Sequence, residues 1–298
     1  MILSSSMFSI VIPTYNRAHL IARTLGSVLR QDFVDFEIIV VDDGSNDNTE
    51  EVVMKFDDKR IQYHRKENAE RGAARNYGAA RAKGAYINFF DSDDLLYENH
   101  LSTAYKLIKE RGEPEFFHLG YDFKLEDGTL INRIDNFDDG ISSILLFDNK
   151  LSCNGVFLRK DIATKFPFDE NRKMASSEDW ALWITLVCRF KLHFTNEITS
   201  SVINHDMRSL RTIPAEKVVA RDLLFLDKLR QDPTVMQTYG SSFKRFIAMR
   251  YTFFMLAFSQ QKQRNEVFKW GMRAFGIHPL ILIDRRFLAS VKNSLLKW

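Results

Sequence analysis

Three carboxylates, Asp91, Asp93 and Asp94, directly follow an apolar and aromatic run at 86–90 that has the character of a strand. Carboxylates this close repel one another, so a fold tolerates them best with a positive charge between them. Mg²⁺ suits such a place, because it is usually held by one or two carboxylates and the oxygens of a substrate phosphate. The alternative is a solvated acidic turn in which Asp93 or Asp94 caps a helix over 95–109. The cluster therefore predicts either a divalent-cation site or a helix cap.

Two other predicted strand ends carry groups suited to a nucleoside. Residues 8–12 and 36–41 are almost wholly apolar, as in parallel strands covered on both faces. Pro13 and Tyr15 follow the first run and Asp43 follows the second. Tyr15 would lie along a base, and Asp43 would accept a hydrogen bond from a ring N–H; the alternative is a turn and a helix cap. A dinucleotide-binding loop is excluded, since no G-x-G-x-x-G follows the first strand.

These groups need a scaffold, and the order of predicted elements supplies one. Strands and helices alternate as far as residue 96, which predicts a doubly wound, mostly parallel α/β sheet flanked by helices. Beyond it we expect a hairpin across Asp127-Gly128, a strand within 151–159 and one or two more within 191–204. The pair Glu178-Asp179 opens an amphipathic helix that turns Leu182, Trp183, Leu186 and Val187 inward.

From residue 214 onward the pattern is helical, with breaks expected near 232–233, 240 and 279. We therefore expect a catalytic domain over 1–212, with nucleotide binding in 1–96 and the acceptor side in 97–212, and a basic helical extension over 213–298. Internal repeats are absent from the sequence.

The charge of the 298-residue chain is uneven. Residues 241–298 hold eleven Lys or Arg against Glu266 and Asp284, a net charge of +9, which leaves −6 for 1–240 in a chain of +3. Two cysteines are too few for a disulfide framework, and no apolar run is long enough to span a bilayer, so a cytoplasmic protein is expected. The acidic part suits metal-assisted chemistry, and the basic part suits attachment to an anionic surface.

Five segments together resemble the motifs of family 2 glycosyltransferases, in the order in which that family has them. They cover roughly the first two thirds of the chain, and the set is specific although each segment alone is weak. They are Ser9-Ile10-Val11-Ile12-Pro13-Thr14-Tyr15-Asn16, Val40-Val41-Asp42-Asp43-Gly44-Ser45, Ala74-Arg75-Asn76-Tyr77-Gly78, Asp91-Ser92-Asp93-Asp94 and Ser177-Glu178-Asp179-Trp180.

The resemblance implies a GT-A fold, a nucleotide-sugar donor, expected to be a UDP-sugar, and an inverting transfer to a hydroxyl of a glycan or lipid-linked acceptor. Asp179 resembles the catalytic base, and Asp93 resembles the ligand of a Mn²⁺ or Mg²⁺ ion that bridges the donor diphosphate. The residues assigned to the donor are Pro13, Tyr15, Asp43, Arg75, Asp91 and Ser92.

The remaining candidates rest on position in the chain. His205 lies where such enzymes often recruit a late histidine to the metal, with a structural histidine as the alternative. Glu178 and Trp180 are expected on the acceptor or diphosphate side. For Glu178 the alternatives are a structural neighbour of the base, a contact to the donor sugar, or the base itself in place of Asp179. Arg208 and Arg211 would meet diphosphate oxygens, with solvated surface charges as the alternative.

The basic tail mixes aromatic and cationic residues, as an interfacial helix on an anionic membrane does. This predicts peripheral attachment of 241–298 to the inner face of the plasma membrane, against the alternative of a packed helical subdomain. No nucleic-acid-binding motif accompanies the charge, so no nucleic-acid partner is expected. A homo-oligomer is a possible assembly. Two alternative functions also stay open: a sugar-phosphate nucleotidyltransferase and a non-catalytic nucleotide-sugar-binding protein.

Overall fold

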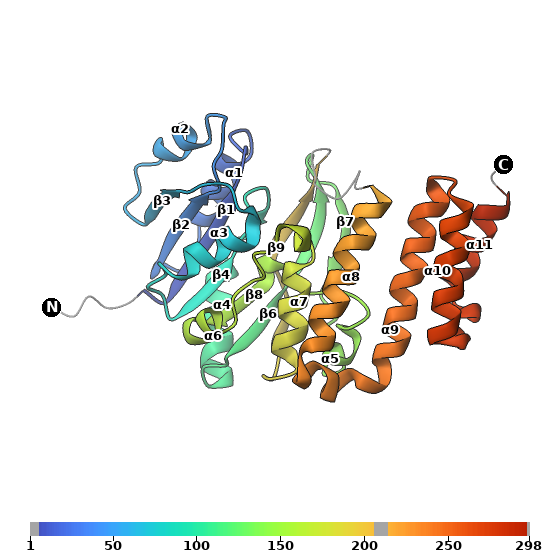
Figure 1. Cartoon of the computed structure of the whole chain (residues 1–298). Coiled ribbons are helices and arrows are strands. Elements are labelled where there is room, and N and C mark those ends of the chain that lie inside the picture. The colour runs from blue at the N-terminus through green and yellow to red at the C-terminus, as the bar shows by residue number, and fades with distance from the viewer. Residues whose placement is uncertain (1–5, 206–213, 297–298) are drawn as a thin grey trace. The chain divides into compact units, whose positions relative to one another are not determined.

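The computed structural model describes residues 6–205 and 214–296 (Figure 1). Contacts between Cα atoms divide the chain into two compact units, 1–208 and 209–298, called here the N-terminal and C-terminal units. The N-terminal unit holds the sheet, and the C-terminal unit is helical in its described part.

The first half of the sheet is parallel, in the order β3-β2-β1-β4 (Figure 1). Every residue of β1, β2 and β4 is buried, as their apolar runs predicted, because helices cover both faces of such strands. The bounds are β1 (Phe8–Thr14), β2 (Phe36–Asp42), β3 (Ile61–Arg65) and β4 (Tyr86–Phe89).

The second half makes the sheet mixed. β4 pairs antiparallel with β8, β8 antiparallel with β6, and β6 parallel with β9, which also pairs antiparallel with the short β5. The expected hairpin is confirmed, since β6 pairs antiparallel with β7 and Gly128 in the connection has a φ of 87°. The bounds are β5 (Leu95–Leu96), β6 (Phe116–Leu125), β7 (Leu130–Ile134), β8 (Val156–Arg159) and β9 (His193–Asn204).

Alternation along β1 sends its side chains to two helical layers. Ile10 and Ile12 join a core cluster with apolar residues of α1 and α4. Val11 faces the other way, toward α3, where Gly78 is needed because a Cβ there would lie 2.3 Å from the Val11 Cγ1. The helices of this unit are α1 (Ile21–Leu29), α2 (Thr49–Met54), α3 (Glu70–Ala79), α4 (His100–Arg111), α5 (Ile141–Ile144), α6 (Lys160–Lys165) and α7 (Glu178–Val187).

Two local expectations for this unit are corrected. The helix expected from residue 95 begins only at His100, because Leu95 and Leu96 pair with β9 instead. The helix-cap alternative for Asp93 and Asp94 is therefore wrong, since the cap position of α4 is Asn99.

The C-terminal unit consists of α8 (Ala215–Gln231), α9 (Pro233–Gln260), α10 (Arg264–Ile277), the 3-10 helix η3 (Pro279–Ile283) and α11 (Arg285–Leu296). Asp232 caps α9 by accepting hydrogen bonds from the N–H groups of Thr234 and Val235. α10 and α11 pack on α9 through apolar side chains such as Phe254, Met255 and Trp270.

The helix breaks expected near 232–233 and 279 are confirmed, but the one at Gly240 is wrong. α9 runs through Gly240, and the chain turns instead after Gln260, where Lys262 has a φ of 60°. Among the described helices none is long and apolar enough to cross a membrane.

Candidate active site

The carboxyl ends of β1, β2 and β4 meet at one edge of the sheet, the usual ligand edge of an open α/β fold. Thr14 is level with Asp42 across β1 and β2, and Val11 is level with Phe89 across β1 and β4. The loops after these strands therefore bring together the predicted residues Tyr15, Asp43 and Asp91.

The Tyr15 loop is fastened to the Asp43 loop. The Asn16 N–H donates to the Ser45 hydroxyl at 2.9 Å, and the Asn46 N–H donates to the Asn16 side-chain oxygen at 2.8 Å. Asn16 takes a φ of 51°, which its short polar side chain tolerates. Pro13 is buried within β1, whereas the Tyr15 ring is 44% exposed. The loop is thus fixed through Asn16, while the neighbouring Tyr15 ring is open to solvent.

Asp43 is buried beside a cation that the sequence reasoning missed. Its Oδ1 accepts hydrogen bonds from the Lys66 ammonium at 2.6 Å and from the Ala69 N–H at 2.9 Å. Lys66 follows β3, the next strand along the edge, which is the signal that could have identified it.

The three carboxylates of the acidic loop after β4 lie close together but have different hydrogen-bond partners. One oxygen of each of Asp91, Asp93 and Asp94 lies within 4.8 Å of the others. Asp94 is fully buried, and its two oxygens accept from the Ile203 N–H at 2.8 Å and the Asn154 amide at 2.7 Å. Asp94 therefore ties the loop to β9 and to the 3-10 turn Cys153–Gly155, and this occupies both of its oxygens.

Asp93 meets His205 across the sheet edge. The His205 Nε2 lies 3.0 Å from the Asp93 Oδ2, although the residues are 112 apart in sequence. The Arg17 guanidinium lies 3.7 Å from the same oxygen, and Arg17 was not among the predicted residues, although it follows the Tyr15 loop directly. His205 is in place because β9 ends one residue before it.

Ser92 contributes through its backbone, since its carbonyl accepts a hydrogen bond from the Thr24 hydroxyl at 3.0 Å. This bond fixes the acidic loop against α1. Arg208 and Arg211 lie outside the described residues.

Arg75 connects the acidic loop to the start of α7. It is 1% exposed, and its two terminal nitrogens each lie 2.8 Å from a carboxylate, Nη1 from Glu178 and Nη2 from Asp91. The guanidinium also lies 5.1 Å from the centre of the Phe168 ring. A buried cation clamped between two carboxylates fixes the position of both, because losing either partner would leave a buried charge uncompensated.

Asp179 stands next to this clamp in the first turn of α7. The pKa of Asp179 is raised to about 6, chiefly by burial and next by the charge of Glu178, while Arg75 and the Trp180 N–H oppose the rise. The Trp180 N–H donates to the Asp179 Oδ1 at 2.7 Å. A carboxylate with this pKa is ionised at neutral pH and still basic enough to accept a proton.

Glu178 and Trp180, on either side of Asp179 in the sequence, both make hydrogen bonds with other residues of the protein. Glu178 is 2% exposed and accepts from the Ser177 N–H at 3.1 Å as well as from Arg75. The Trp180 indole donates to the Leu145 carbonyl at 2.7 Å, so α5 and α7 are joined there. Of the inward set expected on α7, Leu182, Trp183 and Leu186 are buried and Val187 is only half-buried.

Solved structures share this architecture. The chain matches S. aureus TarS residues 1–349 in complex with UDP-GlcNAc with a TM-score of 0.64, at 17% identity, over 92% of this chain and 91% of that one. It also matches the mannosyltransferase PcManGT of Pyrobaculum calidifontis, in complex with GDP-Man and Mn²⁺, with a TM-score of 0.57 at 13% identity, over 99% and 88% of the two chains. The sheet and its flanking helices therefore form a GT-A fold, as the sequence predicted.

Sequence comparison gives the family. The model of Glycosyl transferase family 2 matches residues 9–144. A glycosyltransferase of Rickettsia typhi is 30% identical over 242 residues, which cover 78% of this chain and 75% of that protein. This chain belongs to glycosyltransferase family 2.

Other relatives differ in how much of their length is matched. The chain is 30% identical over 182 residues to the Escherichia coli protein WfgD, a UDP-Glc:alpha-D-GlcNAc-diphosphoundecaprenol beta-1,3-glucosyltransferase, covering 61% of this chain and 70% of WfgD. Against a Rickettsia bellii glycosyltransferase it is 35% identical over 63% of its own length, but this spans only 27% of that relative.

Proposed function

We propose that this chain is an inverting glycosyltransferase that moves a sugar from a nucleotide-sugar donor, a UDP-sugar, to an acceptor hydroxyl. The observation that carries the proposal is the buried Arg75 clamp, whose 2.8 Å contacts join the loop of Asp91 to the helix that begins with Glu178 and Asp179. A metal-and-diphosphate site and a general base have to be held at a fixed separation, and this clamp spans the two loops that would hold them.

In this proposal Asp179 is the general base. Its raised pKa, about 6, suits a group that takes the proton from an acceptor hydroxyl as the oxygen attacks the anomeric carbon. One displacement by the acceptor oxygen inverts the configuration at that carbon, so no second nucleophilic carboxylate is required. Glu178 would hold Arg75 and contribute charge on the sugar side.

The donor would lie along the edge formed by β1, β2 and β4. The exposed Tyr15 ring would cover the base, Asp43 would accept from a ring N–H, and Pro13 would shape the loop between them. Asp91 and the Ser92 segment would meet the ribose. Arg75 is too deeply buried to reach a ligand freely, so we propose that it supports the donor through the Asp91 carboxylate.

A divalent cation, Mn²⁺ or Mg²⁺, fits the chemistry of the donor set. Asp93, with a carboxylate oxygen near both Asp91 and the His205 ring, offers the mixed oxygen and imidazole ligands that Mn²⁺ accepts, and Mg²⁺ would rely on the carboxylates and diphosphate. When bound, the ion would neutralise charge on the departing diphosphate. Asp94 is a poor ligand by comparison, since both of its oxygens accept protein hydrogen bonds.

The acceptor is proposed to be a lipid-linked glycan at the inner face of the plasma membrane. The relative WfgD is named for transfer to an acceptor on diphosphoundecaprenol, and the basic 241–298 segment would favour an anionic membrane surface. Co-sedimentation with vesicles tests the membrane part: binding should require anionic lipid and weaken as salt is raised.

The test of the reaction is a panel of nucleotide sugars with Mn²⁺, scored by thermal shift and by release of nucleoside diphosphate. Binding raises the melting temperature by mass action, and a transferase should also hydrolyse its donor slowly. Donor binding without any turnover would favour the non-catalytic alternative. Pyrophosphate formation from a sugar phosphate and a nucleoside triphosphate would favour the nucleotidyltransferase.

A further inference from the structure

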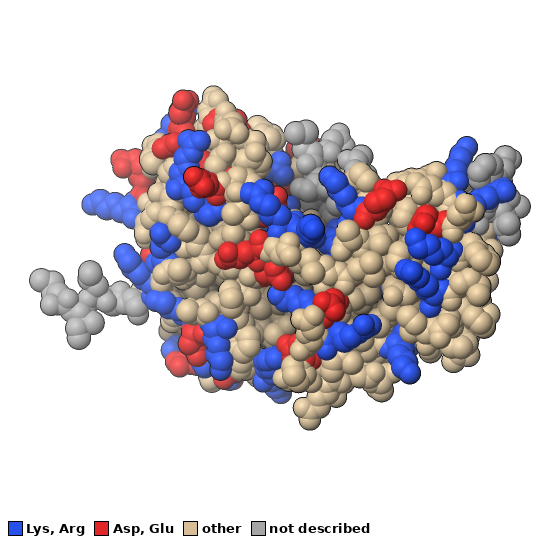
Figure 2. Space-filling model, viewed as in Figure 1, with Lys and Arg blue, Asp and Glu red and all other residues tan. Residues whose placement is uncertain are grey.

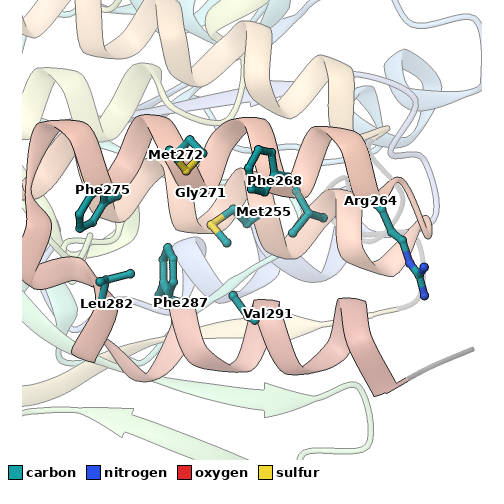
Figure 3. A pocket seen from close by; sticks show the side chains of 10 residues that line it. Met255, Arg264, Phe268, Gly271, Met272, Phe275, Leu282, Phe287 and Val291 are labelled. Atoms are coloured by element: carbon teal, nitrogen blue, oxygen red, sulfur yellow. The ribbon is translucent and has the colours of Figure 1, made fainter.

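An apolar groove lies within the C-terminal unit between α10 and α11 (Figure 3). Its volume is about 480 Å³, within the range of sites that hold a small ligand. Apart from Arg264, every side chain that lines it is apolar, and Figure 3 places Arg264 at one end and Phe275 with Leu282 at the other. The groove is therefore elongated, with a charged end and an apolar end.

The floor of the groove is packed protein. Met255 on α9 is 1% exposed, and Phe287 on α11 is 9% exposed. Gly271 keeps the groove open on the α10 side, because a Cβ there would lie 3.2 Å from the Met255 Cε and 3.9 Å from the Phe287 ring. Any larger side chain at Gly271 would have to occupy the groove or displace Met255.

The rim is apolar and exposed to solvent. Phe268 is 71% exposed and Met272 is 54% exposed, and the other end of the groove adds Phe275 at 40% and Leu282 at 44%. Single exposed apolar side chains are ordinary, but these gather around one groove on the consecutive elements α10 and η3. Such a surface favours an apolar partner.

Positive charge on α10 and α11 indicates which kind of apolar partner would bind. Exposed cations on α10 and α11 include Lys269, Arg273, Arg285 and Lys292, against Glu266, which is paired with Lys269 at 2.8 Å, and Asp284. In Figure 2, Lys and Arg side chains gather over α10 beside a broad surface of other residues. A second copy of this chain would bring the same positive charge to the contact, whereas an anionic amphiphile complements both the groove and its surroundings.

We propose that the groove between α10 and α11 takes one acyl chain of an anionic membrane phospholipid, with the phosphate held by the surrounding cations. The inference rests on the proposed function in one respect: that function brings the protein to the membrane in which the phospholipid lies. It adds a defined site to an attachment that charge alone would make diffuse.

Chain length is the first test. The full chain is titrated with the fluorescent fatty acid cis-parinaric acid, and saturated fatty acids of increasing length then compete for the site. Each methylene that enters the groove should tighten binding roughly fourfold, from about 0.8 kcal/mol per buried methylene, until the groove is full. The absence of saturable binding, or an affinity indifferent to chain length, would refute the site.

Two glycines on α10 give a matched pair of variants. Gly271→Leu fills the groove and should weaken probe binding by roughly tenfold or more. Excluding two methylenes of the probe from the groove would already be enough for a loss of that size. Gly276→Leu makes the same substitution on the same helix, where an added Cβ meets nothing within 4 Å, and should bind like the wild type. Equal binding by all three proteins would place the probe elsewhere and overturn the proposal.

A third variant guards against misfolding of Gly271→Leu. Met272→Glu puts a carboxylate on the exposed rim, so the fold should tolerate it, and binding of the anionic probe and of phosphatidylglycerol vesicles should fall while phosphatidylcholine vesicles stay weakly bound. Unchanged vesicle binding would contradict the proposed groove site.

Two other results would assign the groove to a different occupant and overturn the proposal. If light scattering shows a dimer and Gly271→Leu converts it to a monomer, the occupant is a second copy of the chain. If a polyprenyl phosphate displaces the probe much more strongly than phosphatidylglycerol does, the occupant is an isoprenoid lipid.

Donor hydrolysis is measured on the same proteins. It should be unchanged in all three variants, because all three substitutions lie in the C-terminal unit and outside the candidate active site. A wild-type protein that hydrolyses its donor but does not bind the probe would refute the groove alone, whereas a wild-type protein that binds the probe without hydrolysis would refute the proposed transferase alone.

Discussion

The two units of this chain depart from the usual rule of burial in opposite directions. The N-terminal unit buries charge: Arg75 and Glu178 are at most 2% exposed and lie 2.8 Å apart. The C-terminal unit exposes apolar surface, with Phe268 at 71% and Ile283 at 77%. Each departure costs stability, and each fits a different one of the ligands proposed above. Buried charge suits an anionic donor with its metal, and exposed apolar surface suits a lipid.

The cost differs in kind between the two units. A buried ion pair has lost its hydration and persists only while both partners remain, so removing one is expensive. An exposed apolar side chain costs only the burial it fails to gain, a loss that a ligand can recover. Substitutions in the first unit should therefore have large effects, and those in the second should be mild unless lipid is present.

The largest effect is expected at Asp179. Asp179→Asn removes the proposed base, and kcat should fall by about 10²- to 10⁴-fold while the dissociation constant of the donor stays nearly unchanged. The variant should be at least as stable as the wild type at neutral pH. The native pKa of Asp179, about 6, lies above its ordinary value of 3.8, so ionisation penalises the fold fully above about pH 6 and not at all below about pH 3.8.

Single-turnover kinetics with equilibrium donor binding checks this prediction. The exposed Asp127→Asn, in the β6–β7 turn, serves as the control for loss of a carboxylate. A folded Asp179→Asn protein with near-normal kcat would remove the base assignment.

Arg75 tests whether the buried charges act as one unit. Arg75→Gln leaves Glu178 buried without its cation, and the free energy of unfolding should fall by about 3–5 kcal/mol. In the wild type, kcat should fall about tenfold per pH unit below about pH 6, as Asp179 takes up its proton. Removing the guanidinium raises the pKa of Asp179 further, so this acid limb should move to higher pH.

Urea denaturation and a pH–kcat profile measure the two effects separately. Arg75→Lys keeps the charge and should restore much of the pH profile, although one ammonium cannot hold both carboxylates as the planar guanidinium does. An acid limb that stays in place in folded Arg75→Gln would reduce Arg75 to a structural residue.

Asp93 and Asp94, adjacent in the acidic loop, should respond differently to the same substitution. Asp93→Asn should remove the part of nucleotide affinity that depends on Mn²⁺, by at least the roughly 10- to 100-fold that loss of an outer-shell partner costs. Asp94→Asn should instead lower stability and leave the metal dependence in place, because Asp94 accepts from Ile203 and Asn154. Calorimetric titration of nucleotide across Mn²⁺ concentrations checks both, and identical curves for Asp93→Asn and the wild type would contradict the metal site.

The smallest effect is expected in α9. Gly240 lies in mid-helix, and an added Cβ meets nothing within 4 Å. Gly240→Ala should therefore stabilise the protein by about 0.5–1 kcal/mol, since alanine loses less backbone entropy in a helix. Thermal unfolding measures it, with Gly128→Ala as the contrast: Gly128 has a φ of 87°, so alanine there should destabilise. A destabilising Gly240→Ala would mean that the helix needs a flexible point there.

The sequence by itself determined the elements of the sheet and the edge at which the site lies. Unbroken apolar runs such as 36–41 predict strands covered on both faces, and parallel strands bring their carboxyl ends to one edge. Tyr15, Asp43 and Asp91 could be placed together for that reason, without knowing any contact between them. The family motifs added roles that no periodicity carries.

Only the tertiary structure decided which of these groups touch. Asp93 and Asp94 are adjacent and chemically identical, yet one meets His205 and the other is buried under β9, because each depends on packing more than 100 residues away. Arg75 likewise reaches Glu178 across 103 residues, a pairing with no local signal. In the C-terminal unit, Gly240 and Gly271 are both helical glycines, but only Gly271 lies against Met255 and opens a groove. Local sequence fixes which face of an element is apolar, whereas the neighbour that covers it is set by the packing of the whole chain.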